Sequence, residues 1–262
     1  TKEAIKWYAK AIEEKQDADT YYKYAQMLKA EGKYAEADKQ MKQFASLAPN
    51  DQRAKAFTSN PEYLPALKNQ AKLYSITKSD ISSEKSDFGT VLTSDNNVYF
   101  SSAKNTSRKK NGWNEEPYLD LYKATRNVDG TLSQATEVAE LNTKWHDGPA
   151  AISSDGNTMY YGSESFNESE FQKNKAKKLK FGQIYLYKAT KEGDKWANSK
   201  PLPFNSKEYS VRNPSVSKDG KTLYFSSDMP GTKGMSDIYK VYILSEGTFG
   251  PPVTLGDKIN TE

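Results

Sequence analysis

The sequence predicts an α + β multidomain chain in which α-helical hairpins are followed by a β-propeller. Three observations predict this fold class. Residues 1–74 contain a single glycine and repeat apolar side chains with helical period. The rest of the chain alternates in period two between turn residues, as short strands do. Within that second part, one short block recurs around the aspartates at positions 95, 155 and 219.

The helical part is best defined over residues 18–49. Gly32 separates two apolar runs as a helix-ending residue, and Pro49 follows the second run as a stop signal. Residues 4–11 and 51–57 predict further helices on either side. A helix–turn–helix of about 34 residues resembles the tetratricopeptide repeat family. The positions predicted to pack inward are Tyr21, Tyr24, Ala25, Leu28, Ala37, Met41 and Phe44.

The resemblance to tetratricopeptide repeats implies a concave, partner-binding face made by the first helices. The residues that this face would carry here are Asp19, Tyr22, Gln26 and Lys29. The alternative is that these side chains are ordinary solvated surface. Tyr22 fits that alternative least well, because it is large and aromatic.

The second part repeats a turn, an aromatic strand, another strand and a closing motif. Each block contains a tight turn with Asp at its start, and Asp-Gly is a strong hairpin signal. Each also closes with a hydrophobic residue, Asn, and Thr or Ser, at 141–143, 204–206 and 259–261. Four strands per unit, repeated, are the signature of a β-propeller blade. The regular recurrence of the aspartates favours a turn role over metal binding or acid–base chemistry.

These patterns predict a helical domain over 1–60, a linker over 61–73 and a propeller over 74–262. The three blades are expected at about 74–142, 143–205 and 206–262. A closed propeller needs at least four blades, and about three helical repeats are usual for stability. We therefore expect the chain to be a segment of a longer protein.

The third block resembles a known family of repeats. Residues 213–228 resemble the WD-like repeats of TolB-type propellers, with Pro, a small residue, Asp-Gly and an aromatic strand ending in Ser. The module order resembles the large OmpA-family periplasmic proteins of Bacteroidetes, including those associated with type IX secretion. That resemblance implies a periplasmic, outer-membrane-associated protein that binds peptidoglycan through an OmpA-like domain. No such domain, and no export signal, is recognisable in residues 1–262.

Composition argues against several kinds of chemistry. The chain has no Cys and one His, so we expect no disulfide, thiolate metal site, multi-histidine metal site or Cys nucleophile. A net charge of +4 is too mild to predict nucleic-acid binding, and no apolar run is long enough to span a membrane. A Ser–His–Asp site would have to use His146, and Gly-x-Ser-x-Gly is absent. Residues 231–234 lack the full phosphate-loop spacing. No catalytic residue, metal site or cofactor is predicted.

Two basic insertions are candidate interaction sites in the predicted blades. The first is Arg108, Lys109 and Lys110, and the second contains Lys173, Lys175, Lys177, Lys178 and Lys180. Solvated loops are one interpretation. The other is docking of an acidic partner or of lipid headgroups, since long loops lie on one rim of a propeller.

Together these observations predict a non-enzymatic periplasmic scaffold. Its expected partners are outer-membrane or periplasmic proteins of a type IX secretion or gliding complex, with peptidoglycan bound through a domain outside this segment. A propeller-type hydrolase or a small-ligand sensor is the alternative. An enzyme would need convergent polar groups around His146, and a sensor would hold its ligand in the propeller channel.

Overall fold

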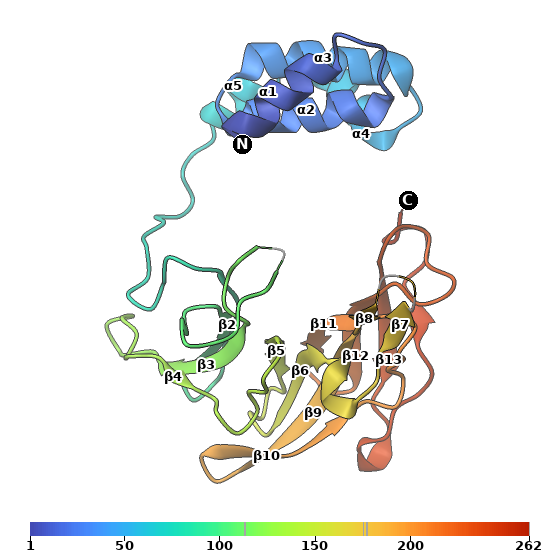
Figure 1. Cartoon of the computed structure of the whole chain (residues 1–262). Helices are drawn as coiled ribbons and strands as arrows, with labels where there is room; N and C mark the ends of the chain where they lie inside the picture. The colour runs from blue at the N-terminus through green and yellow to red at the C-terminus, as the bar shows by residue number, and fades with distance from the viewer. Residues whose placement is uncertain (113, 175, 177, 262) are drawn as a thin grey trace. The chain divides into compact units, whose positions relative to one another are not determined.

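The computed structural model describes residues 1–112, 114–174, 176 and 178–261 (Figure 1). The chain divides into two compact units, Thr1–Ile76 and Thr77–Glu262. The first unit is helical and the second consists of antiparallel sheets. The expected order of a helical part followed by a β part is therefore confirmed.

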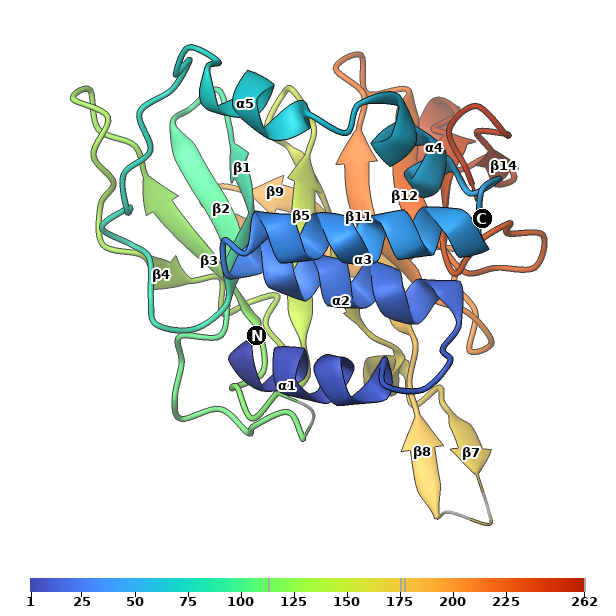
Figure 2. The same cartoon turned by 90° about the horizontal axis from the view of Figure 1, so that it is seen from above.

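The helical unit is organised around an antiparallel pair, α2 and α3 (Figure 2). Gly32 lies in the turn between them with φ +74°, a left-handed conformation that glycine adopts without strain. Asp17 caps α2 by accepting a hydrogen bond from the Thr20 amide. The helices are α1 (Lys2–Ala11), α2 (Ala18–Ala30), α3 (Tyr34–Leu47), α4 (Gln52–Ser59) and α5 (Tyr63–Lys68).

The core of this unit contains the residues that the helical period predicts. Leu28 and Phe44 are almost fully buried, and burial of each such side chain is worth about 1.5–3 kcal/mol. All seven predicted inward positions are buried: Tyr21, Tyr24, Ala25, Leu28, Ala37, Met41 and Phe44. The hairpin and its packing are thus confirmed, and its assignment to the tetratricopeptide family stays a prediction. Residues 61–73, expected as a linker, include α5.

The second unit contains three four-stranded antiparallel sheets, each built from one predicted block. Strands follow one another across each sheet, except that the second sheet has a hairpin inserted between its second and third strands. The first sheet is β1 (Asp87–Leu92), β2 (Asn97–Ser102), β3 (Asp120–Thr125) and β4 (Thr136–Glu137). The second is β5 (Asp147–Ile152), β6 (Thr158–Glu164), β9 (Ile184–Glu192) and β10 (Lys195–Pro201). The third is β11 (Val211–Val216), β12 (Thr222–Ser227), β13 (Asp237–Tyr242) and β14 (Val253–Thr254).

The three sheets pack as neighbouring propeller blades do. Their first strands are adjacent, since β5 contacts both β1 and β11 (Figure 2). Sheets stacked around their innermost strands form the architecture of a β-propeller. Each first strand also has a register irregularity at the equivalent position, at 88–91, 147–150 and 212–215. The total number of blades stays a prediction.

Successive side chains of β6 point to opposite faces of the second sheet. Each face packs into one of two hydrophobic cores, and together these cores join the three sheets. Tyr161 packs into the cluster shared by the first and second sheets, with Tyr99 and Trp196. Its neighbour Tyr160 points to the other face and packs with Phe225 in the cluster shared by the second and third sheets. A strand with period-two geometry presents successive side chains to opposite faces. The aromatic strands predicted from sequence are therefore buried on both sides of the middle sheet.

The recurring aspartates have the predicted turn role. Asp155 Oδ1 accepts hydrogen bonds from the Ser153 hydroxyl at 2.5 Å and from the Asn157 amide at 3.0 Å. In the third sheet, Asp219 Oδ1 accepts from the Ser217 hydroxyl at 2.6 Å and from the Lys221 amide at 3.1 Å. These bonds close the turn between the first and second strands and lower the pKa of each carboxyl.

The closing asparagines tie the end of each block to its third strand. Asn205 accepts from the Leu186 amide at 2.9 Å and donates to the Leu186 carbonyl at 2.8 Å. Asn142 makes the same pair of bonds with Leu121, and Asn260 makes it with Ile238. This repetition places Leu121, Leu186 and Ile238 at equivalent positions of the three third strands.

Candidate functional site

The helical unit has a groove lined by three of the four residues predicted for its concave face. Tyr22, Gln26 and Lys29 project from α2 into this groove, where they meet residues of α3 and the C-terminal helices. The remaining lining residues are Met41, Arg53, Ala56, Phe57, Asn60 and Tyr63. Asp19, the fourth predicted residue, lies beside the groove through an ion pair with Arg53 at 3.2 Å.

Arg53 organises the charges of this groove, although the sequence analysis did not single it out. Its guanidinium lies 4.3 Å from the centroid of the Tyr22 ring and pairs with Asp51 at 2.8 Å. The side-chain and backbone hydrogen bonds from Arg53, together with its charge, lower the pKa of the Asp51 carboxyl to about 2. Lys29 lies 4.8 Å from the centroid of the Tyr63 ring. The groove thus presents two tyrosines, each covered by a cation, a surface suited to aromatic and charged contacts.

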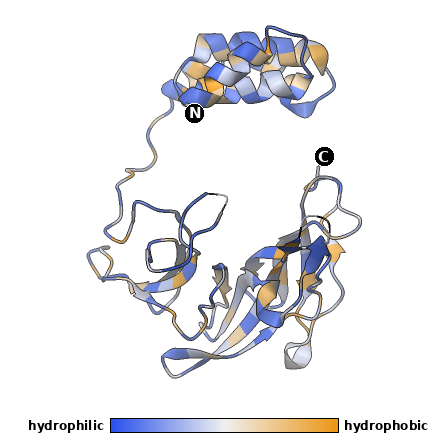
Figure 3. Ribbon diagram, viewed as in Figure 1, coloured by the Kyte–Doolittle hydropathy of each residue, from blue (hydrophilic) through white to orange (hydrophobic). Residues whose placement is uncertain are grey.

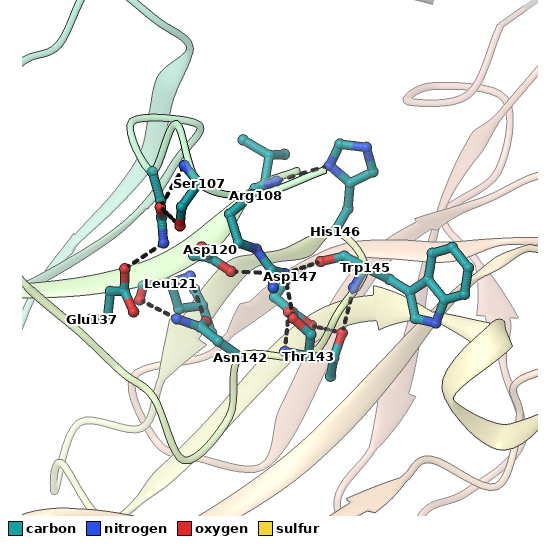
Figure 4. A network of polar contacts seen from close by, with 12 residues as sticks. Ser107, Arg108, Asp120, Leu121, Glu137, Asn142, Thr143, Trp145, His146 and Asp147 are labelled. Carbon is teal, nitrogen blue, oxygen red and sulfur yellow. Dashed lines mark hydrogen bonds and ion pairs between the residues drawn. The ribbon is translucent and has the colours of Figure 1, made fainter. Parts of the chain in front are cut away.

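The first basic insertion divides into an outward part, Lys109 and Lys110, and an inward part, Arg108, whose contacts Figure 4 shows. Lys109 and Lys110 are exposed, as expected of a basic loop. Arg108 instead forms an ion pair at 3.1 Å with Asp120, which is 2% exposed. It also donates to the carbonyls of Thr143 and Trp145. The guanidinium of Arg108 therefore holds the loop against the first and second sheets, a contact between distant residues that the basic run did not reveal.

Two buried carboxylates lie in this network. Burial raises the pKa of Asp120 to about 6, although the positive charge of Arg108 opposes the rise. Burial raises the pKa of Asp147 further, to about 7, and the hydrogen bond that it accepts from the Thr143 amide at 2.5 Å opposes this. Asp147 holds the Thr143 backbone in place, and Asp120 pairs with the Arg108 side chain. Their perturbed pKa values are thus explained by burial within the fold.

His146 is also held by backbone and side-chain contacts. Its Nδ1 accepts from the Leu119 amide at 3.1 Å, and its Nε2 lies 3.0 Å from Asn111 Nδ2. An imidazole whose Nδ1 accepts a hydrogen bond is unprotonated there, and burial lowers its pKa, with Arg108 contributing. These contacts give His146 a positioning role between two loops. Its two ring nitrogens contact Asn111 and the Leu119 amide, and neither partner is a serine.

A run of aromatic rings connects the two basic insertions. Tyr118 contacts Trp145 with 6.0 Å between ring centroids, and Trp145 contacts Phe166 at 4.8 Å. Phe166 in turn contacts Phe171 at 5.8 Å. We call this surface the basic–aromatic rim and define it as Lys109, Lys144, Trp145, Phe166, Phe171, Lys173 and Lys180. Lys144 lies over Trp145, and Lys109 and Trp145 line one pocket.

The second basic insertion, expected as a loop, forms a two-stranded hairpin, β7 (Gln172–Asn174) and β8 (Leu179–Phe181). Of its predicted interaction residues, Lys175 and Lys177 lie outside the described residues, whereas Lys178 is described and exposed. The hairpin and the Arg108 insertion lie at the same end of their sheets, because each joins a second strand to a third. The expected rim of long loops is therefore present.

The remaining motifs have structural partners. In the segment 231–234, the Lys233 amide donates to Asp237 at 2.8 Å and its ammonium pairs with Asp257 at 2.7 Å. That lysine is occupied by carboxylates, which is unlike a phosphate-binding loop. Within the described part of the chain, no cluster of three or more His, Asp or Glu side chains is arranged to hold a metal ion.

Comparisons with known proteins give loose structural likenesses only. The sequence matches no protein-family model and no curated protein. TolB from Acinetobacter baumannii is 18% identical with a TM-score of 0.42, over 69% of this chain and 34% of that chain. A putative TolB from Agrobacterium tumefaciens is 15% identical with a TM-score of 0.37, over 63% of this chain and 44% of that one.

A puromycin-hydrolysing peptidase of Mycobacterium tuberculosis is 14% identical with a TM-score of 0.41, covering 66% of this chain and 22% of that chain. The chain thus spans about a third of the Acinetobacter protein and less of the peptidase. TM-scores below 0.5 assign the chain to no family. In the described residues, no helix has the length and apolar character that crossing a membrane requires.

Proposed function

We propose that this chain is a non-enzymatic periplasmic scaffold within a larger OmpA-family protein. In this proposal it links an outer-membrane complex of type IX secretion or gliding machinery to peptidoglycan. Peptidoglycan is held by a domain outside the present chain, and the present units bind proteins. The proposal rests on module order, on the family resemblance of the sequence and on one observation from the structure.

That observation is the groove of the helical unit. Two partly exposed cations, Lys29 and Arg53, cover the rings of Tyr63 and Tyr22. Tyr and Arg are enriched among residues that dominate protein–protein binding, because they combine large contact area with hydrogen bonding. Met41 and Phe57 supply an apolar floor to the same groove. The combination supports protein binding, and no comparable set of convergent acid, base and nucleophile supports catalysis among the described residues.

Affinity purification of the tagged full-length protein from its native cells tests the proposal. We expect outer-membrane or periplasmic components of a secretion or gliding complex to co-purify. Lys29→Glu reverses a charge inside the groove and should reduce the recovery of those components at least about tenfold. Lys39→Glu makes the same charge change on an exposed position of α3 outside the groove and should leave recovery unchanged.

Two outcomes of this purification would contradict the proposal. Recovery of the wild-type protein only as a free monomer would contradict a scaffold role. Equal recovery with Lys29→Glu and Lys39→Glu would remove the groove as the binding surface. Circular dichroism of both variants verifies that the helical unit remains folded, since neither lysine belongs to the buried core.

A further inference from the structure

We propose that the β7–β8 hairpin docks the β unit onto an anionic lipid surface, with its lysines on lipid phosphates and its exposed apolar side chains at the acyl boundary. This inference goes beyond the scaffold function and does not depend on it. The β7–β8 hairpin projects from the β unit (Figure 2). The inference rests on how charge and apolar area are distributed over the two faces of this hairpin.

The strand register assigns the side chains to two faces. Gln172 pairs with Phe181 and Asn174 pairs with Leu179, so these four side chains share one face. On that face Leu179 is 49% exposed and Phe181 is 46% exposed. Each pair of opposed residues lies on one side of the ribbon, and successive pairs alternate. The hairpin therefore carries a solvent-exposed apolar pair on a ribbon that is otherwise hydrophilic (Figure 3).

The opposite face gathers positive charge. Lys173 lies directly across from Lys180, an arrangement in which like charges destabilise a strand pair. Both ammonium groups are held by one ring, at 5.5 Å and 4.5 Å from the centroid of Phe171. The negative face of an aromatic ring offsets part of the repulsion. A bound anion would neutralise the remainder, which makes this face a receptive site for phosphate groups.

The described residues supply no carboxylate counter-ion to the two lysines. Neither lysine forms an ion pair with a described carboxylate. The acidic residues just before the hairpin point elsewhere: Glu168 accepts from the Tyr187 hydroxyl at 3.1 Å, and Glu170 accepts from the Tyr185 hydroxyl. Both carboxylates are therefore hydrogen-bonded to tyrosines of β9 in the second sheet. The ammonium groups of the hairpin are therefore available to an external anion.

A lipid surface explains both faces better than an acidic protein does. A rigid partner laid on one side of the ribbon would contact either the lysines or the apolar pair. A fluid interface surrounds a projecting ribbon, so that Leu179 and Phe181 enter the acyl boundary while the lysines reach headgroup phosphates. The basic–aromatic rim continues this surface through Phe166 to Trp145 and Lys144, a combination typical of membrane interfaces.

Vesicle co-sedimentation of the full chain tests the proposal. Binding is compared between vesicles of phosphatidylcholine alone and vesicles containing about one third phosphatidylglycerol. We expect binding only to the anionic vesicles, and weakening as salt shortens the screening length from about 10 Å at 0.1 M to about 3 Å at 1 M. Phe181→Trp adds a spectroscopic readout, because an indole entering the acyl boundary shifts its emission to the blue.

Three double variants separate the contributions. Lys173→Gln with Lys180→Gln should weaken binding about thirtyfold. Leu179→Ser with Phe181→Ser should weaken it at least about tenfold. The control, Lys195→Gln with Lys200→Gln, removes the same charge from exposed positions of β10 and should change binding less than about twofold.

Several outcomes would overturn the proposal. Absence of binding to anionic vesicles would do so directly. Equal weakening by the β10 control would show that net charge alone is responsible. Binding to soluble poly-glutamate as tight as to vesicles, with no effect of the Leu179 and Phe181 substitutions, would assign the hairpin to an acidic protein partner instead.

Discussion

Replacing Asn205 by alanine tests the asparagine contact that recurs in all three sheets. The substitution removes the acceptor of the Leu186 amide and the donor to the Leu186 carbonyl. Leu186 is fully buried, so its amide would be left unsatisfied. Its carbonyl keeps a partner, the Leu202 amide at 2.8 Å. One orphaned buried donor and the loss of a net stabilising bond together lower the free energy of unfolding by about 2–4 kcal/mol.

Urea unfolding followed by tryptophan fluorescence measures this loss. Trp196 is 4% exposed in the core shared by the first and second sheets and reports on the β unit, whereas Trp7 is 64% exposed and changes little. With a slope of about 2 kcal/mol per molar urea, the midpoint should fall by about 1–2 M. Asn157→Ala is the matched control, because Asn157 is exposed and its hydrogen bonds to Asp155 lie in an exposed turn.

The control should stay within about 0.5 kcal/mol of the wild type. A loss of less than about 0.5 kcal/mol for Asn205→Ala would refute the reasoning, since it would mean that water or a shifted strand replaces the asparagine. An equivalent loss is expected for Asn142→Ala, because Leu121 is as fully buried as Leu186. A smaller loss is expected for Asn260→Ala, because Ile238 is 42% exposed.

Three further predictions concern other contacts. Phe44→Ala, at a side chain 1% exposed, should destabilise the helical unit by about 3–5 kcal/mol, measured as a lower melting temperature by circular dichroism at a helix band. Arg108→Met should cost about 3–5 kcal/mol by leaving buried Asp120 unpaired, and combining it with Asp120→Asn should restore part of that loss in thermal unfolding. The pKa of Asp147 is raised from 3.8 to about 7, so its contribution to stability is complete below about pH 4 and is lost as pH rises through 7. Asp147→Asn should therefore flatten that part of a pH–stability profile; an unchanged profile would contradict the assignment.

Much of the fold could be predicted because its signals are local. The spacing of apolar residues around Leu28 and Phe44 reports which side of each helix is buried, and the structure confirms it. Asp155 and Asp219 sit in turns whose hydrogen bonds span only two residues on either side, so their role was readable from sequence. The repeated blocks likewise predicted three four-stranded sheets.

The candidate sites were predicted only in part. Tyr22 and Lys29 were expected on one face, and they do line one groove. Arg53 was not singled out, although its place two residues after the N-capping Asp51 is a local signal that could have found it. The connection of the two basic insertions through Trp145 and Phe166 involves separate loops. No periodic pattern marks contacts of that kind.

The sequence by itself determined the order of the units, the type of each element and the faces that pack inward. Those properties depend on backbone geometry that repeats every few residues, so composition and spacing are sufficient to reveal them. The tertiary structure alone decided that Arg108 turns inward to the backbone of Thr143 and Trp145 and that Trp145 meets Phe166 at the rim. Which charges are neutralised and which stay available depends on how the sheets stack and where their loops meet. That is a property of residues far apart in the chain, and it separates the inward-facing Arg108 from the exposed Lys109 and Lys110 beside it.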